Sequence, residues 1–339
     1  MTNEIKTFKR FYIFLPVIIG LSVVTWLFYE EFDSALFKDI HLSSRLLGGL
    51  LLAFFFMFGR DAGLIWRFRL ISDHSLSWRQ AFNVNMLCEF TSAVTPSSVG
   101  GSSLIVLFLN KEGINAGRSS ALMISCLFLD ELFLVLACPV ALLLFSFSDL
   151  FGDVTILSSG IRFFFFSIYA AISLWTFLLF FALFKRPEYV KRILLAIFRL
   201  PFIRRWRRSV ETLTENLVQS SGEMSRKPMT FWLRAFGITC LSWTSRYLVV
   251  NALFFAFATE GSQLLAFARQ LVLWVLMTIS PTPGGSGVSE YIFQIYYADF
   301  FAVSGMALVV TFVWRIITYY MYLFIGALII PTWVKNLKN

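Results

Sequence analysis

The chain has 339 residues, of which 58% are hydrophobic and only 14% are charged, and its formal net charge is +9. This composition excludes an ordinary soluble globular protein and is typical of a polytopic membrane protein. In a soluble protein the positive charge would suggest a nucleic-acid partner. Here the basic residues gather in particular loops, as membrane topology predicts, so no nucleic-acid partner is expected.

The first apolar run, at 11–29, follows a basic N-terminal segment and lacks a small-x-small cleavage site. It is long enough to cross a bilayer, so we expect an uncleaved span with a cytoplasmic N-terminus. Further runs of spanning length lie near 44–59, 119–145, 160–184, 229–258 and 301–330. The sequence therefore predicts an all-α integral membrane protein with about six full transmembrane helices.

Two other apolar regions, near 80–110 and 264–299, are each split by a cluster of proline and glycine. Each half has about 15 residues and would cross only part of a roughly 30 Å hydrocarbon core. Basic residues flank the first region and acidic residues the second, so the two ends of each region favour the same side of the membrane. We expect two re-entrant hairpins that enter from opposite faces, although full crossing of either hairpin stays open.

The order of span, span, hairpin and span then occurs twice with opposite orientation, which predicts an inverted repeat with both termini in the cytoplasm. The whole chain, 1–339, would form one membrane domain. Its first repeat would cover 1–145, and its second 160–184 and 229–330, with a basic cytoplasmic connector at 185–228. A short sequence similarity between the segments that begin at Thr95 and Thr282 supports the duplication.

At each break a threonine precedes a proline, so Thr95 and Thr282 could cap helices that begin at Pro96 and Pro283. The free N–H groups of a helix start favour an anion such as phosphate. The residues expected to bind substrate are Thr95, Ser98, Gly100, Gly101, Thr282, Gly284, Gly285 and Ser286, with Arg246 and Arg315 as compensating cations. Alternatively, the glycines only allow helices to pack closely.

Ionisable side chains inside a span cost about 2.5–3.5 kcal/mol each, so each needs a partner or a path for water. The acids so placed are Glu89, Asp130, Glu131 and Glu290. Glu290 lies seven residues after Pro283, about two turns along the predicted helix, and could carry a coupling proton. Glu89, Asp130 and Glu290 could equally be structural acids. Arg60 and Asp61 are expected at a membrane interface.

Sequence motifs for catalysis or cofactor binding are missing: there is no HExxH, Walker loop or Cys/His metal spacing, and the two histidines fall far from the breaks. We therefore expect no cofactor, no metal and no catalytic residue, and transport driven by gradients or a partner. The basic segment 191–208 could lie on an anionic leaflet, or could reflect only the positive-inside bias.

The motif at the second break is Pro281-Thr282-Pro283-Gly284-Gly285-Ser286-Gly287, followed by Glu290. Together with Thr95-Pro96, Gly100-Gly101 and the late Arg315, it resembles the flippase-like family that includes the transmembrane region of lysylphosphatidylglycerol synthases. The resemblance covers essentially the whole chain. It implies an inner-membrane protein that handles an aminoacylated phospholipid or a polyprenyl-linked glycan. The chain ends at Asn339, so we expect no aminoacyl-transferase domain and no lysyl transfer. Ser102-Ser103 departs from the family pattern and puts the substrate in doubt.

We therefore expect a lipid flippase that moves an anionic or phosphate-bearing lipid, either a phospholipid or a polyprenyl-linked one, across the inner membrane. A membrane-embedded headgroup transferase, with Glu89 or Glu290 as general base, is one alternative. Another is a non-transporting accessory subunit of envelope synthesis. A homo-oligomer or an envelope-synthesis partner stays open.

Overall fold

The computed structural model describes residues 43–335 apart from 96, 152–155, 186, 200–206, 208–209, 212–213, 216–217, 219–221, 223, 258–260, 281, 283 and 303–304. The predicted span at 11–29 lies outside these residues. The described residues form helices and no strand, and four of the helices are long and apolar enough to cross a membrane: Ser44–Ile71, Ala116–Leu144, Gly160–Lys185 and Met306–Ile330. The predicted all-α membrane class is confirmed. The number of spans, the hairpins and the repeat stay predictions.

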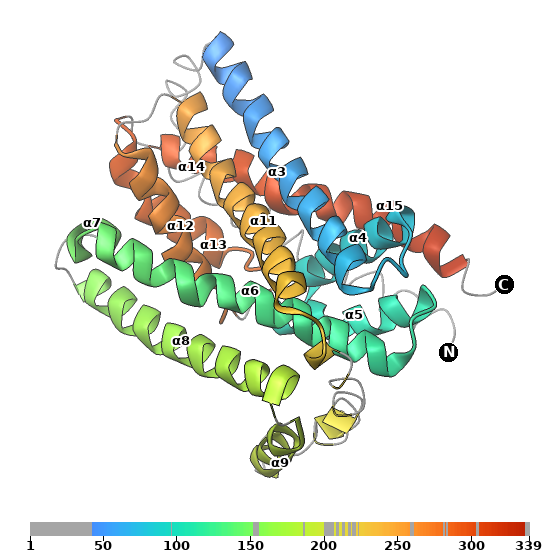
Figure 1. Cartoon of the computed structure of the whole chain (residues 1–339). Helices are drawn as coiled ribbons and strands as arrows, with labels where there is room; N and C mark the ends of the chain where they lie inside the picture. Colours follow the sequence, from blue (N-terminus) through green and yellow to red (C-terminus); the bar gives the residue numbers. More distant parts are fainter. Residues whose placement is uncertain are drawn as a thin grey trace, which may run out of the picture.

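Two long helices, α3 (Ser44–Ile71) and α11 (Met229–Ala256), pack along each other at the centre of the molecule (Figure 1). Small residues let them approach closely, because a Cβ atom on Gly63 would lie 2.1 Å from Ser242 Oγ. A Cβ on Gly49 would lie 2.5 Å from Ala256 Cβ. Close packing through small residues is the usual way in which helices associate in membranes.

The first split region forms α4 (Trp78–Val94) and α5 (Ser97–Lys111), which pack against each other. A capping box at the start of α4 satisfies its first N–H groups, as Ser77 and Gln80 bond reciprocally. The Thr95 hydroxyl donates back to Thr91 O over 2.6 Å and so completes α4. The expected cap of α5 by Thr95 stays a prediction.

The second split region forms α12 (Gln263–Met277) and α13 (Val288–Tyr296). The sequence predicts a helix from Pro283, and this start is wrong by five residues. Gly284, Gly285 and Gly287 have φ values of +57°, +71° and +84°, which no right-handed helix allows. The segment therefore turns, and Glu290 lies in the first turn of α13 rather than two turns along a helix.

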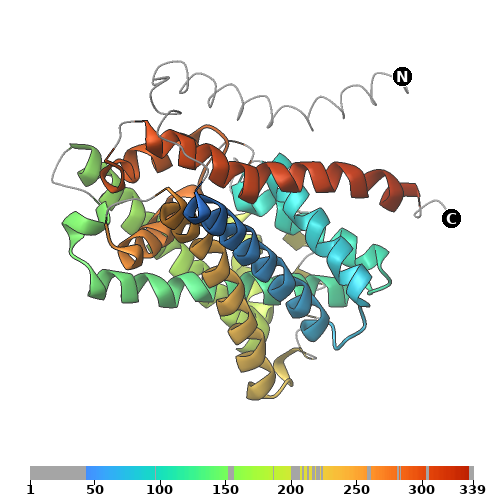
Figure 2. The ribbon, with the colours of Figure 1, turned by 90° about the horizontal axis from the view of Figure 1, so that it is seen from above.

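The other helices surround this centre. α6 (Ala116–Leu144) packs on α8 (Ile156–Phe180), which a π-helix, η1 (Phe181–Lys185), extends. The predicted span at 301–330 corresponds to the candidate span Met306–Ile330, which consists of α14 (Met306–Arg315), a π-helix η4 (Ile316–Tyr320) and most of α15 (Met321–Lys335). Figure 2 shows α15 extending beside α4, where Gly326 packs on Phe90. The shorter elements are α7 (Phe147–Phe151), α9 (Pro187–Ile197) and η3 (Ala298–Phe300).

Candidate functional site

The two helix breaks meet beside a cavity of about 280 Å³. The N–H of Gly284 in the second break donates to the carbonyl of Thr95 in the first, over 3.3 Å. Side chains from α3, α4, α6, α11 and α12 line the cavity, together with residues of the second break and of the last span. Segments far apart in the sequence therefore contribute to a single site.

The carboxylate of Glu290, which is fully buried, is held by three donors at the second break. Gly287 N and Ser289 Oγ donate to its Oε2 over 2.8 and 2.7 Å, and Arg315 Nε donates to its Oε1 over 2.8 Å. Arg315 also donates to Gly284 O over 3.2 Å. Both charges of this ion pair are thus compensated within the protein, which favours a structural role for Glu290.

Three N–H groups of the second break already have acceptors within the protein. Gly284 N bonds to Thr95 O, Gly285 N to Thr282 O over 3.1 Å, and Gly287 N to Glu290. The sequence predicts bare backbone that binds an anion here, but these three donors already have protein acceptors. A phosphate would need another donor in the cavity.

Tyr319, in the π-helix η4, connects the two breaks. Its hydroxyl accepts from Ser286 Oγ over 3.0 Å and donates to Ala93 O over 3.2 Å. The guanidinium of Arg315 lies 3.9 Å from the centre of its ring. A Cβ at Gly284 would lie 2.2 Å from the ring, so only glycine fits there. π-helical turns occur often at functional sites.

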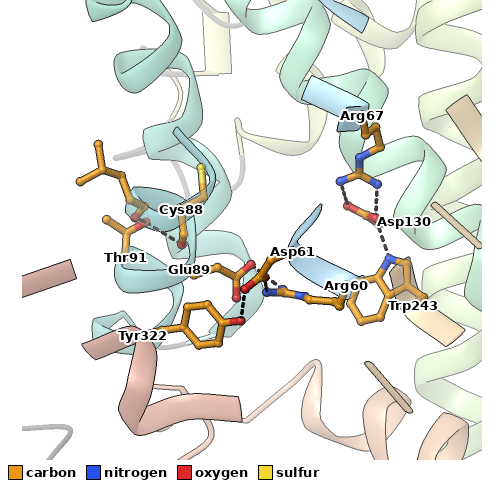
Figure 3. Close-up of polar contacts among 10 residues, drawn as sticks. Arg60, Asp61, Arg67, Cys88, Glu89, Thr91, Asp130, Trp243 and Tyr322 are labelled. Atoms are coloured by element: carbon orange, nitrogen blue, oxygen red, sulfur yellow. Dashed lines mark hydrogen bonds and ion pairs between the residues drawn. The ribbon is translucent and has the colours of Figure 1, made fainter. Parts of the chain in front are cut away.

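Arg60 lies in the cavity wall and is 5% exposed, and its expected place at a membrane interface stays a prediction. Figure 3 shows its contacts. Its guanidinium donates to Asp61 over 2.8 Å and to Glu89 over 2.5 Å. Tyr322 OH donates to the second oxygen of Asp61 over 2.6 Å. Glu89 is therefore the partner of Arg60, an arrangement that fits the structural alternative for this acid.

Arg67, seven residues or about two helical turns after Arg60 in α3, forms a second ion pair. Both of its Nη atoms donate to Asp130, with Nη2 and Oδ2 separated by 3.0 Å, and Nη1 also donates to Thr239 (Figure 3). Trp243 Nε1 donates to the same carboxylate over 2.7 Å. Asp130, the third acid singled out from the sequence, is thus also compensated by an arginine.

Arg246 differs from these arginines. Among the residues that the structure describes, no carboxylate lies within the 4.0 Å limit of an ion pair with Arg246. Its guanidinium instead lies 4.5 Å from the centre of the Trp274 ring and 5.9 Å from that of Trp243. Since Arg246 lines the cavity, its charge is available to a ligand.

The structure thus brings most of the predicted residues to one place. Those that line the cavity are Glu89, Asp130, Glu131, Arg246, Gly284, Gly285 and Arg315. Thr95 and Ser286 lie next to it through their bonds to Gly284 and Tyr319, and Thr282 bonds to Ser280. Ser98, Gly100 and Gly101 belong to the first five residues of α5, and their side-chain environment lies outside the described structure.

Sequence reasoning missed several residues of the site. These are Arg60, Asp61, Arg67, Asn85, Trp243, Trp274, Tyr319 and Tyr322. One signal was present: Arg60 and Arg67 are seven residues apart, so they share one face of a helix that continues past the predicted end at 59. Their acid partners are 29 and 63 positions away, and no local pattern identifies them.

Comparison with known proteins gives two matches. The family model described as "Lysylphosphatidylglycerol synthase TM region" matches residues 13–326. The chain is also 25% identical over 298 residues to a UPF0104 membrane protein of Archaeoglobus fulgidus, an alignment that covers 82% of this chain and 85% of that protein.

Proposed function

The chain belongs to the family of the lysylphosphatidylglycerol synthase transmembrane region, and from this premise we propose that it is a lipid translocase of the inner membrane. Its substrate would be a lipid with a phosphate in its headgroup. Family membership fits a protein that handles lipid, and an arginine in the cavity supports a phosphate-bearing headgroup.

The observation that carries the proposal is the uncompensated guanidinium of Arg246 in a cavity where the helix breaks meet. Arginine binds phosphate through two parallel N–H donors, and its charge is strongest where water is scarce. Trp274 and Trp243 hold the guanidinium by cation–π contacts without neutralising it. In transporters, broken helices surround substrate sites in the same way.

Movement of the lipid would require the two breaks to separate and meet again. In the structure they are joined by the Gly284–Thr95 bond and by Tyr319, which reaches Ala93. These are a few neutral hydrogen bonds, each with a net contribution of about 0.5–1.5 kcal/mol. A contact of this size can break and form during rocking of one half against the other, as alternating access requires.

The alternative of a headgroup transferase has less support. It needs a general base near the headgroup, and the two candidates, Glu89 and Glu290, are both in ion pairs with arginine. We therefore propose no catalytic residue. The accessory-subunit alternative is an outcome of the experiment below.

The test measures the accessibility of labelled phospholipid headgroups in liposomes that contain purified protein. We expect wild type to speed the exchange between leaflets and Arg246→Gln to lose this activity. Arg234→Gln is the matched control, because Arg234 lies on the same helix but is exposed and outside the cavity wall. It should behave as wild type.

Three results would contradict the proposal. Normal exchange in Arg246→Gln would remove Arg246 from the site. A chemically altered lipid in the extract would identify an enzyme. Absence of exchange with every phospholipid tested, despite folded protein, would favour an accessory subunit.

A further inference from the structure

Glu131 is a second charged residue in the cavity wall that has no counter-charge. Its Oε2 is buried without a hydrogen-bond partner, and no arginine or lysine of the described structure forms an ion pair with it. It follows Asp130 in α6, but both Nη atoms of Arg67 donate to Asp130 and one of them also to Thr239. A buried carboxylate oxygen left unpaired costs about 1–3 kcal/mol or more, so a ligand that donates to it would bind favourably.

The carboxylates around the cavity outnumber the arginines by one. Four arginines line the cavity: Arg60, Arg67, Arg246 and Arg315. Five carboxylates lie on the wall or bond to these arginines: Asp61, Glu89, Asp130, Glu131 and Glu290. The site is therefore not a positive pocket for a simple anion. After the ion pairs form, one positive group, Arg246, and one negative group, Glu131, remain.

Asn85 adds an unpartnered donor to this arrangement. It is 1% exposed, lines the cavity from α4, and its Nδ2 has no partner within the described part of the chain. Arg246 and Asn85 can both donate to phosphate oxygens, whereas Glu131 can only accept when it is ionised. The complementary ligand has an anionic acceptor and, elsewhere within the same cavity, a donor.

We propose that Glu131 is a specificity-determining residue, which binds an O–H or N–H donor that the lipid headgroup carries beyond its phosphate. This inference rests on the proposed function and deepens it. Hydroxyl and ammonium groups can both donate the hydrogen bond that Glu131 would accept. The cavity volume of about 280 Å³ is at the low end for small-molecule sites, which suits a single phospholipid headgroup and not an oligosaccharide.

The test compares binding of phospholipids with identical acyl chains to purified protein by native mass spectrometry. Phosphatidylglycerol supplies hydroxyl donors, phosphatidylethanolamine supplies an ammonium donor, and phosphatidylcholine has a phosphate and a positive charge but no N–H or O–H. We expect wild type to bind at least one donor lipid about tenfold more tightly than phosphatidylcholine, the effect of one charge-assisted hydrogen bond. Glu131→Leu should remove this preference, and Glu188→Leu, at an exposed site, should keep it.

Glu131→Gln distinguishes the two sources of the donor. Its amide oxygen still accepts a hydrogen bond but carries no charge. If the donor is a hydroxyl, the variant keeps most of the preference for phosphatidylglycerol. If it is an ammonium, the variant loses most of the preference for phosphatidylethanolamine. This variant nearly matches glutamate in shape, so it also serves if Glu131→Leu fails to fold.

Equal binding of all three lipids by wild type, or a preference that Glu131→Leu leaves intact, would overturn the inference. Measuring exchange in liposomes alongside binding separates it from the proposed function. Selective binding that depends on Glu131, without exchange, would support this inference and contradict the translocase. Equal exchange of all three lipids, unaffected by both Glu131 variants, would support the translocase and contradict this inference.

Discussion

Arg60 in α3 and Arg246 in α11 occupy comparable places, near the middle of two central helices that pack on each other, and both line the cavity. Arg60 holds the carboxylates of Asp61 and Glu89. Arg246 lies over the rings of Trp243 and Trp274 and forms no ion pair with a described residue. The same residue type can thus fix the fold where the chain neutralises it and remain available to a ligand where the chain does not.

Arg315, like Arg60, is neutralised by a carboxylate, and its partner Glu290 is completely buried. It therefore gives the strongest test of whether a paired arginine fixes the fold. We expect Arg315→Leu to lower the free energy of unfolding by about 3–5 kcal/mol, since it leaves a buried carboxylate uncompensated. Thermal unfolding in detergent measures the loss. The double variant Arg315→Leu, Glu290→Leu should recover much of it, and an unchanged melting temperature in the single variant would show that the pair is not structural.

Glu89 should show a smaller effect of the same kind. Glu89→Gln leaves Arg60 with Asp61 and an amide oxygen, so we expect a loss of about 1–3 kcal/mol in unfolding free energy. The same unfolding assay measures it, with the exposed Glu188→Gln as control. A loss of lipid exchange at full stability would instead place Glu89 in the transport step.

The sequence predicts the helical membrane class and the two breaks well, because long apolar runs and proline–glycine clusters are local signals. It mislocates the helix start at Pro283, since proline favours a first turn but the positive φ of Gly284, Gly285 and Gly287 cannot be foreseen from their identity.

For the candidate site the sequence identifies most of the polar residues but not their pairing. It ends the second span before Arg60 because a charge usually marks the edge of the membrane. Only the fold shows that Glu89, 29 residues later, compensates it. For the same reason, the sequence does not distinguish Arg246 from Arg315, although among the described residues only Arg315 of the two forms an ion pair.

Supplying Arg246 with a carboxylate would make it resemble Arg60. Trp274 faces the guanidinium at 4.5 Å, so Trp274→Glu brings a carboxylate close to it, while Trp274→Gln removes the same ring without adding charge. Both variants lose the aromatic contact, so their difference reports the charge alone. We expect lipid exchange by Trp274→Glu to be about tenfold slower than by Trp274→Gln, a difference of about 1.4 kcal/mol. Equal rates would show that the charge of Arg246 does not act on the lipid.

The smallest expected effect is the change in the unfolding free energy of Arg246→Gln. Its small size would distinguish Arg246 from Arg60. Loss of the contact with Trp274 removes about 0.5–2 kcal/mol of cation–π attraction. Loss of a half-buried charge that lacks a counter-charge relieves a desolvation penalty of comparable size. We therefore expect the unfolding free energy to change by no more than about 1 kcal/mol, while lipid exchange is lost. A loss of stability as large as that of Arg315→Leu would mean that Arg246 fixes the fold as Arg60 does, and the phosphate site would have to be sought elsewhere in the cavity.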